Sequence, residues 1–256
     1  MSNLSFFRKI IIFFKDILSP IKCYSCKKEW EYLCENCFEK IEKYSWFCCI
    51  CKKESPNFKI HKKCLIENRL FNWWNFYDKK IFLDRVIIMT HYKNNIIKKL
   101  IKDFKFYWKK DIWIELWKKL WNFVKNNIEF PFLDKEKSCV VVIPVSLHWF
   151  KKLRRWFNQS EILAENFAKI NNFTYNNNIV IRKKYTRQQS KLSRQERLIN
   201  LENAFKINKN QVDNIDNKII FLIDDVFTTG STLNEIAKIL KQNWAKKVIW
   251  ICIASN

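Results

Sequence analysis

Two adjacent carboxylates followed by a run of hydroxyl groups form the stretch of this 256-residue chain best suited to chemistry. Asp224 and Asp225 come directly after five apolar residues, 219–223, a run too short for a helix and typical of a buried parallel strand. The turn that follows is rich in hydroxyls and contains the chain's one glycine: Thr228, Thr229, Gly230, Ser231 and Thr232. Apolar residues then recur at helical spacing from Leu233 to Leu240. Because such a turn offers free backbone N–H groups and the positive end of the helix dipole, the pattern predicts a phosphate site.

This stretch resembles the phosphoribosyl-pyrophosphate (PRPP) motif of type I phosphoribosyltransferases. In an open α/β sheet, ligands bind at the carboxyl ends of the strands, where the two acids are predicted to stand. The resemblance implies that Asp224 and Asp225 hold the ribose 2′- and 3′-hydroxyls near a Mg²⁺ and are the catalytic candidates. It also implies that residues 228–232 hold the 5′-phosphate. The competing interpretation is a buried strand and a capped helix, with Asp and Thr as ordinary cap residues.

Eight of the ten cysteines lie between Cys23 and Cys64, in two groups built on CxxC pairs. The groups read C-x2-C-x7-C-x2-C and C-x2-C-x9-H-x2-C, and the metal ligands they predict are Cys23, Cys26, Cys34, Cys37, Cys48, Cys51, His61 and Cys64. Such sets are typical of structural zinc, with every coordination position closed by protein. The alternatives are free core thiols and a solvated loop histidine, and Cys49 competes with its neighbour for a place in the second set. CxxC pairs inside a larger chain favour a reducing, cytoplasmic compartment over disulfides.

The composition is strongly basic, with a formal net charge of +23. This balance favours phosphate-rich partners such as nucleic acid, although a nucleotide-biased genome rich in lysine codons produces the same excess. The hydrophobic fraction of 48% is enough for a core. We find no run of about 18 uncharged apolar residues, so no membrane span is predicted. Residues 1–20 read as an amphipathic helix, which we expect to pack on the protein in preference to a membrane surface.

Strands and helices are expected to alternate beyond the cysteine groups. Apolar runs predict strands at 86–89, 138–144, 219–223 and 248–254, with an edge strand at 177–181. Helical spacing predicts helices at 96–104, 111–124, 160–170 and 233–240. This alternation predicts an α/β fold with a doubly wound parallel sheet. The resemblance to phosphoribosyltransferases given above, together with the family resemblance given next, implies that this sheet is type I phosphoribosyltransferase-like and is preceded by a small zinc-ribbon domain. The expected divisions are the helix at 1–20, a double zinc ribbon at 21–68 and the phosphoribosyltransferase-like domain at 69–256.

Short motifs between these elements resemble the ComF family, competence-associated phosphoribosyltransferase-like proteins with an N-terminal double zinc ribbon. Beyond the cysteine groups and the PRPP motif, the matching segments are 104–108, 143–145, 147–148, 155–159, 186–192 and 197–205. The resemblance implies a pyrophosphate-side loop formed by Arg154, Arg155, Asn158 and Gln159. It also implies a flexible lid that carries Thr186, Gln189, Arg194 and Arg197. The alternative for each arginine is a solvated surface charge.

Two functions follow from the ComF resemblance. The first is binding of PRPP with Mg²⁺, and phosphoribosyl transfer (a glycosyltransferase reaction) if the protein is active, in natural competence and DNA uptake. The second is a non-catalytic component that binds single-stranded DNA beside a helicase-like import ATPase. In that case zinc ribbons, basic loops and aromatic side chains grip the strand by phosphate contacts and stacking. The chain offers no obvious general acid, base or nucleophile, so the sequence does not indicate an acceptor substrate.

Glycine and tryptophan are present in unusual proportions, one glycine and twelve tryptophans. Glycine alone usually makes up about 7% of a chain. The ComF family has glycine where this chain has Trp156, and it tends to glycine at Trp108 and Trp244. We therefore hypothesise that such tryptophans are glycine in the living protein, encoded by UGA codons that the source lineage reads as glycine. The alternative is genuine tryptophan that stacks on nucleic acid; Lys191 and Asn203 also occupy common family glycine positions, which a codon change does not explain.

Overall fold

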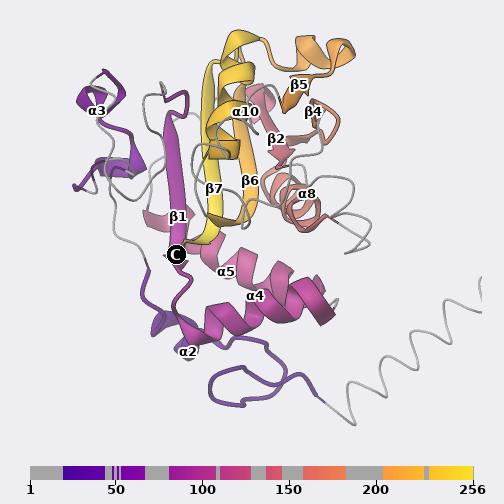
Figure 1. Ribbon diagram of the computed structural model, residues 1–256. Helices are drawn as coiled ribbons and strands as arrows, with labels where there is room; N and C mark the ends of the chain where they lie inside the picture. The colour runs from indigo at the N-terminus through magenta and orange to yellow at the C-terminus, as the bar shows by residue number, and fades with distance from the viewer. Residues whose placement is uncertain are drawn as a thin grey trace, which may run out of the picture.

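A five-stranded parallel sheet forms the centre of the protein, in the order β1-β7-β6-β2-β3 (Figure 1). The computed structural model describes residues 20–43, 48, 51, 53–66, 81–107, 110–127, 137–145, 158–182, 204–227 and 231–255. The strands are β1 (Arg85–His91), β2 (Val140–Pro144), β3 (Thr174–Tyr175), β6 (Ile219–Phe227) and β7 (Lys247–Ser255). The strand with the acid pair, β6, is the middle one of the five, so both of its edges are hydrogen-bonded.

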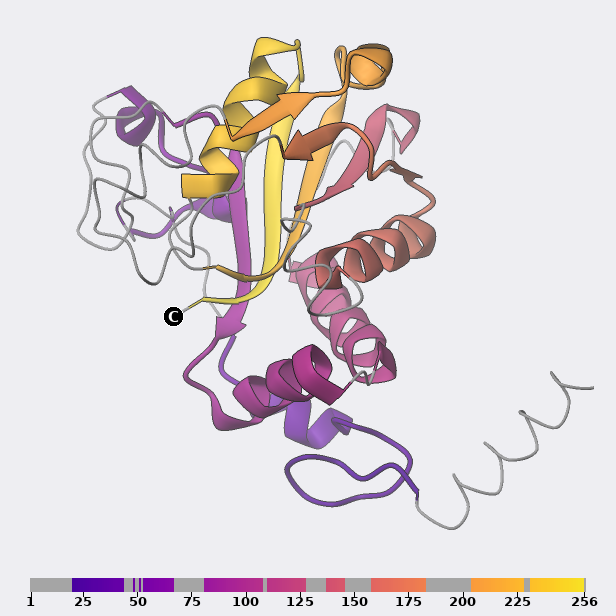
Figure 2. The same cartoon turned by 45° about the vertical axis from the view of Figure 1, so that its right-hand side comes forward.

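Both faces of this sheet are covered, which is why its strands read as continuous apolar runs. Alternate side chains of β6 enter two separate cores: Phe221 packs with the helices on one face and Leu222 with those on the other. The first face carries α4 (Asn95–Tyr107), α5 (Lys110–Asn127) and α8 (Gln159–Asn171). The second carries α10 (Ser231–Gln242) and the antiparallel pair β4 (Val180–Arg182) and β5 (Phe205–Ile207), as Figure 2 shows. The predicted doubly wound parallel sheet is confirmed.

The predicted edge strand is wrong. The segment expected to lie along the sheet, 177–181, ends in β4, which pairs with β5 and belongs to a separate two-stranded sheet. The actual edge is β3, two residues long, whose pairing with β2 ends where the backbone N–H of Asn176 reaches the Val142 carbonyl oxygen at 3.0 Å. Ile179 and Val180 instead pack into the α10 side of the sheet. Apolar character alone predicts that these residues are buried, but it does not predict which sheet they join.

The central strand also runs further than its apolar residues suggest. β6 continues through the acid pair, with Asp224 opposite Cys252 and Phe227 opposite Ser255 of β7. The acids therefore lie within the last part of a paired strand, whereas the sequence predicts that they follow its end. The long partner β7 explains the difference, because it offers backbone groups as far as Ser255. The other strands and helices are confirmed, except that residues 137–139 form a 3₁₀ turn before β2. The helix predicted at 1–20 falls almost wholly outside the described residues.

The described tryptophans divide into two kinds. Trp117 and Trp250 are fully buried, the first with its ring edge-on to Phe167 at a centroid distance of 5.8 Å. Trp30 and Trp244, by contrast, have left-handed φ angles of 74° and 65° and side chains that are 63% and 77% exposed. That backbone region costs most residues about 1–2 kcal/mol, and glycine adopts it freely. Among the described residues, Trp30 and Trp244 are therefore the tryptophans whose backbone suits glycine. Trp108 and Trp156, for which glycine was also hypothesised, lie outside the described residues.

The Trp244→Gly substitution should stabilise this chain. Trp244 follows the end of α10, where its N–H donates to Lys241 and the N–H of Ala245 donates to Leu240, at 3.2 and 3.1 Å. This is the hydrogen-bond pattern of a Schellman helix end, in which glycine is preferred. We expect the free energy of unfolding to rise by about 1 kcal/mol in urea denaturation. Trp250→Gly should lower it by at least about 3 kcal/mol. UGA codons at Trp30 and Trp244, with UGG at Trp117 and Trp250, would support the hypothesis that only the exposed pair is glycine in the living protein. UGG at all four positions would refute it.

Candidate functional site

The acid pair of β6 is held by hydrogen bonds from two directions. Both go to one oxygen, Oδ1 of Asp224: the Ser160 hydroxyl donates to it at 3.0 Å and the backbone N–H of Asp225 at 2.8 Å. Ser160 lies in the first turn of α8, whose N-cap is Asn158, and the Asn158 side chain accepts from the Ser160 N–H at 3.2 Å. The start of α8 is therefore tied to the end of β6 across 64 residues of sequence.

A second helix begins close to the same acids. The chain leaves β6 after Phe227 and enters α10 at Ser231, so three residues separate the strand from the helix. Thr232 is half-buried in the first turn of α10. The first N–H groups of any helix have no partner within it, and they carry the positive end of the helix dipole. Two carboxylates beside two helix N-termini, those of α8 and α10, can bind a polyhydroxylated ligand that also carries phosphate groups.

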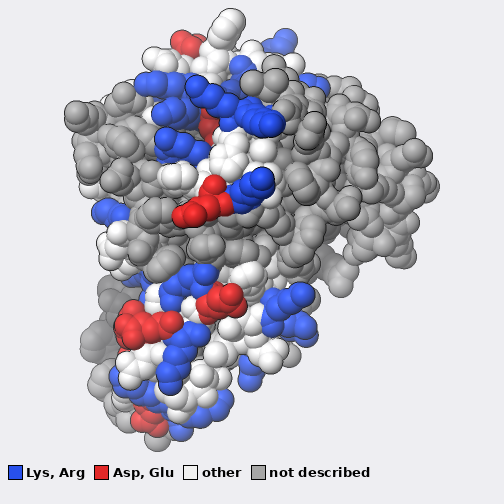
Figure 3. All heavy atoms as spheres, turned by 90° about the vertical axis from the view of Figure 1, so that its left-hand side faces the viewer, with Lys and Arg blue, Asp and Glu red and all other residues white. Residues whose placement is uncertain are grey.

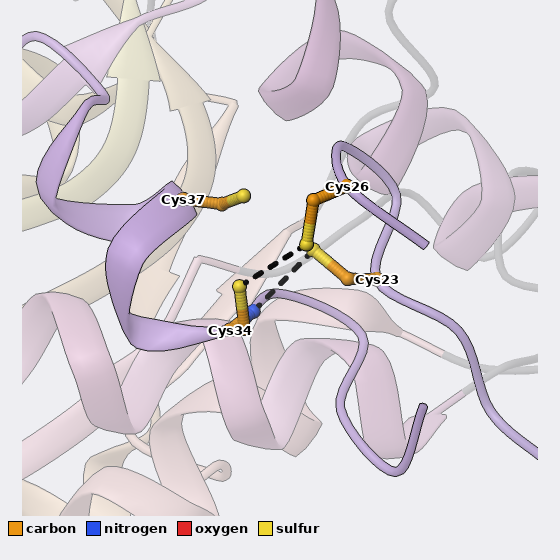
Figure 4. A group of neighbouring side chains, drawn as sticks. All are labelled: Cys23, Cys26, Cys34 and Cys37. Atoms are coloured by element: carbon orange, nitrogen blue, oxygen red, sulfur yellow. Dashed lines mark hydrogen bonds between the residues drawn. The ribbon is translucent and has the colours of Figure 1, made fainter. Parts of the chain in front are cut away.

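The first cysteine group comes together in space as its spacing predicts. Cys34 is the N-cap of α2 (Glu35–Glu39) and Cys37 lies inside it, while Cys23 and Cys26 come from the preceding turn. Figure 4 shows the four side chains around a common centre, with the sulfurs within 4.8 Å of one another. Burial raises the pKa of the Cys23 thiol, but hydrogen bonds to its sulfur, led by the backbone N–H of Cys34, lower the pKa to about 6. Four closely spaced sulfurs, one of them ionised near neutral pH, form a group that could hold a metal ion.

The second group gathers Cys48, Cys51, His61 and Cys64 within the same 4.8 Å limit. The His61 ring places Nδ1 3.2 Å from the Cys51 sulfur and Nε2 3.1 Å from the carbonyl oxygen of Glu54. Metal-binding histidines usually donate their second ring N–H to such an oxygen, because this bond fixes the ring orientation. A solvated loop histidine would have no reason to be held at both nitrogens, so the geometry favours a metal ligand.

The two cysteine groups pack against opposite ends of β1. Lys43, just after the first group, forms an isolated antiparallel β-bridge through its backbone with Thr90 near the end of β1. Lys59, within the second group, forms another with Arg85 at the start of β1. In Figure 1, α2 lies below the sheet, beside α4, and α3 (Lys62–Ile66) lies at the upper left. The first group is further held to the helices, since the Tyr24 hydroxyl donates to Asp103 of α4 at 2.5 Å. Each group is thus an attachment to the α/β body as well as a candidate metal site.

Glu115 of α5 makes two of the polar contacts between the first cysteine group and the helices. Its two carboxylate oxygens accept the backbone N–H groups of Tyr32 and Leu33 at 3.1 and 2.9 Å. In a Glu115→Gln variant one of these oxygens becomes an NH₂ group, which cannot accept. We expect the free energy of unfolding in urea to fall by about 2 kcal/mol. Asp111→Asn, four residues earlier on α5 and exposed, removes the same charge and should lower it by less than about 0.5 kcal/mol; equal effects would contradict the assigned contact.

Comparison with known proteins decides the family. Competence protein F of Haemophilus influenzae is 30% identical over 89% of this chain and 88% of its own length. The chain belongs to the ComF family. Competence protein ComFC of Bacillus subtilis is 26% identical over 82% of this chain and 78% of its own. DNA utilization protein YhgH of Escherichia coli strain K12 is 36% identical over 40% of this chain and 42% of its own.

The family of phosphoribosyl transferase domains matches residues 161–256, which span α8 to the end of β7. With the parallel sheet described above, this match confirms the type I phosphoribosyltransferase fold. The solved structure of the allosteric regulatory enzyme of purine biosynthesis covers 47% of this chain and 23% of that chain, at 17% identity and a TM-score of 0.31. A score that low adds nothing to the assignment. Among the helices that the structure describes, none combines the length and apolar character that a membrane crossing needs.

The residues implied by the ComF resemblance are described only in part. Asn158 and Gln159 are almost completely buried at the start of α8, where Asn158 caps the helix. Their described role is to build the α8 terminus beside the acid pair. The backbone of Ser231 and all of Thr232 belong to α10, as stated above. The remaining candidates lie outside the described residues: Arg154, Arg155, Thr186, Gln189, Arg194, Arg197, Thr228, Thr229 and Gly230.

Ser160 is the site residue that sequence reasoning missed. It was expected only as the first residue of a helix, and a serine just inside a helix start is an ordinary feature. The one local sign of this residue is that a typical N-cap residue, Asn158, stands two positions before the Ser160 hydroxyl. Nothing in that signal points to a carboxylate 64 residues away, because the contact depends on how α8 packs against β6.

Proposed function

We propose that this ComF-family protein binds PRPP with Mg²⁺ at the carboxyl end of β6. The observation that carries the proposal is the acid pair, Asp224 and Asp225, held in the central strand, whose end at Phe227 is separated from α10 by three residues. In this proposal the two carboxylates hold the ribose hydroxyls and a Mg²⁺. The N-terminus of α10, with Ser231 and Thr232, holds the 5′-phosphate. The start of α8 lies on the pyrophosphate side, together with Arg154 and Arg155 of the preceding loop.

If the protein turns over, the reaction displaces pyrophosphate from ribose C1. The contribution of the chain is then to hold the sugar and its phosphates, to place cationic groups beside the leaving pyrophosphate and to exclude water. Arg194 and Arg197, in the segment that precedes β5, are the proposed lid residues. Since no general acid or base stands out in the sequence, we propose ligand binding, and pyrophosphate release from PRPP would show transfer.

The names of the relatives place the proposed role in DNA uptake. Two are called competence proteins and the others DNA utilization proteins. We extend that role to this chain and infer that it works in the cytoplasm, beside a helicase-like import ATPase. We also propose that the two cysteine groups hold structural zinc, because four-cysteine and three-cysteine, one-histidine sets with all positions closed are typical of that metal.

The test is a thermal-shift titration of the zinc-loaded protein with PRPP and Mg²⁺, paired with a pyrophosphate-release assay. Ligand at 100 times its dissociation constant stabilises a protein by about 2.7 kcal/mol, so binding should raise the melting temperature by several degrees. Pyrophosphate alone and ribose 5-phosphate alone should give smaller shifts, because each occupies part of the site. A melting temperature unchanged by PRPP with Mg²⁺ would refute the proposal.

Binding of single-stranded DNA is the second candidate, and it rests on the charge of the surface. Figure 3 shows basic side chains gathered in the upper part of one face, with acidic and basic side chains interleaved below. Among its described residues, the second cysteine group carries four exposed lysines, Lys53, Lys59, Lys62 and Lys63. Phosphate contacts of this kind release counterions, so the affinity for an oligonucleotide should fall steeply with salt. Salt-sensitive binding that survives substitution of both acids would place the DNA site outside the PRPP site.

A further inference from the structure

The hydrogen bond between Ser160 and Asp224 has a consequence for ligand recognition. Ser160 is 2% exposed, so its hydroxyl has almost no access to a ligand in the site. Its hydroxyl donates to the Asp224 carboxylate at 3.0 Å. A side chain this deeply buried can influence ligand binding only through the group that it contacts, and here that group belongs to the acid pair.

Among the contacts that the structure describes, two donors on Oδ1 restrain the orientation of the Asp224 carboxylate. The N–H of Asp225 comes from the adjacent residue and is part of the strand itself. Only the Ser160 hydroxyl comes from another element, so it alone of the two ties the carboxylate to α8. Ser160 is fixed in turn, because its own N–H donates to the capping side chain of Asn158. The series Asn158, Ser160, Asp224 thus links the start of α8 to the acid pair on β6.

A donor to a carboxylate has two effects on binding. It narrows the rotation of the carboxylate about its last bond, so less conformational entropy is lost when the ligand binds. It also favours the charged form, which is the form that a divalent cation and sugar hydroxyls require. Both effects concern ligand affinity, and neither needs Ser160 to touch the ligand.

We propose that Ser160 is the positioning residue of the acid pair, holding Asp224 in the orientation that receives the ribose hydroxyls and the cation of a phosphoribosyl ligand. This inference rests on the proposed function. Helix α8 would then contribute to recognition of the sugar as well as of the pyrophosphate. Loss of the hydroxyl therefore weakens the ligand's sugar and metal contacts and leaves the fold intact.

The test is a double-mutant cycle on PRPP affinity in Mg²⁺, measured by isothermal titration calorimetry on the full chain. Ser160→Ala should raise the dissociation constant about tenfold, the size expected for loss of a hydrogen bond to a charged group. In an Asp224→Ala background the same substitution should have an effect of less than about twofold, because the oxygen that accepts from Ser160 is gone. Ser160→Thr, which keeps the hydroxyl, should restore most of the affinity, unlike a substitution that merely disturbs packing.

The possible results separate this inference from the proposed function. If the unaltered protein shows no PRPP binding, the proposed function fails. If it binds, and Ser160→Ala binds equally well, the positioning role is refuted and the PRPP site stands. An equal tenfold loss in the Asp224→Ala background also refutes it, since the effect then does not pass through Asp224. Far-ultraviolet circular dichroism and the melting temperature of the unliganded variants give the check on folding.

Discussion

Replacing both acids, in the variant Asp224→Asn with Asp225→Asn, should abolish the stabilisation by PRPP and Mg²⁺. An amide cannot supply the negative charge that a hard divalent cation requires of its oxygen ligands. We expect the dissociation constant to rise at least about 100-fold, equivalent to about 2.8 kcal/mol, and the ligand-induced melting shift to vanish. Simple electrostatics predicts the opposite direction: the substitutions make an already basic protein more positive, which favours a polyanion such as PRPP.

A matched control is available before β6, in the 3₁₀ helix Lys209–Asn214 and the turn that follows it. Asp213 and Asp216 are exposed, and changing both to asparagine removes the same two charges away from the carboxyl end of the sheet. This variant should bind PRPP as the unaltered protein does, or slightly more tightly. If the two double variants lose affinity equally, the loss reflects overall charge. If neither loses affinity, PRPP does not bind at the acid pair.

The central part of the fold follows from the sequence because its strands are buried on both faces. A residue such as Phe221 or Leu222 must be apolar whichever helix covers it, so β2, β7 and the first five residues of β6 appear as apolar runs. The edges carry less information. β3 has two residues, one of them exposed, and its apolar content is too small to mark a strand. Hence the edge was wrongly assigned to 177–181, where Ile179 and Val180 supply the apolar signal but pack with α10 and β5.

The sequence predicts which residue types form the site. It predicts less well the hydrogen bonds that join these residues to distant segments. The acid pair and both cysteine groups were identified because their chemistry depends on local spacing, which a sequence displays directly. Contacts between distant segments were not: neither the Ser160 bond to Asp224 nor the Glu115 bonds to Tyr32 and Leu33 leave a local pattern. Such contacts require two elements to be placed first, and a serine or a glutamate on a helix has many other uses.

The positive φ angle at Trp244 shows a conflict between sequence and structure that composition had already suggested. The backbone there adopts the left-handed region because α10 ends in a Schellman pattern, whichever side chain follows it. The side chain gains little in return, since 77% of it stays exposed. Trp121 shows the contrast: its side chain is buried, and its ring N–H donates to the Asn171 side-chain oxygen at 3.0 Å. Local strain and exposure together distinguish the glycine-like positions, which counting residues cannot do.

If the first cysteine group holds zinc as proposed, removing the ion should unfold residues 20–43 locally and leave the sheet folded. This segment has few apolar side chains of its own, and its buried sulfurs are organised around a common centre. Structural zinc contributes on the order of 10–16 kcal/mol to the folding of small isolated domains, far more than the contacts with α4 and α5 supply. Cys37→Ser, which removes one ligand from α2, should therefore lower the zinc content from two ions per chain to one, as measured by native mass spectrometry.

Hydrogen exchange at the Tyr32 and Leu33 amides reports whether loss of the zinc ion also separates the first cysteine group from α5. Their N–H groups are protected by Glu115 only while the first group stays docked on α5. In Cys37→Ser we expect both amides to exchange at least about 100-fold faster, because local opening controls their exchange. The matched control is His61→Gln, which removes one ligand from the second group at the other end of β1; it should also release one zinc ion but leave Tyr32 and Leu33 protected. Unchanged protection in Cys37→Ser would mean that Glu115 and the packing of α2 hold the segment without a metal.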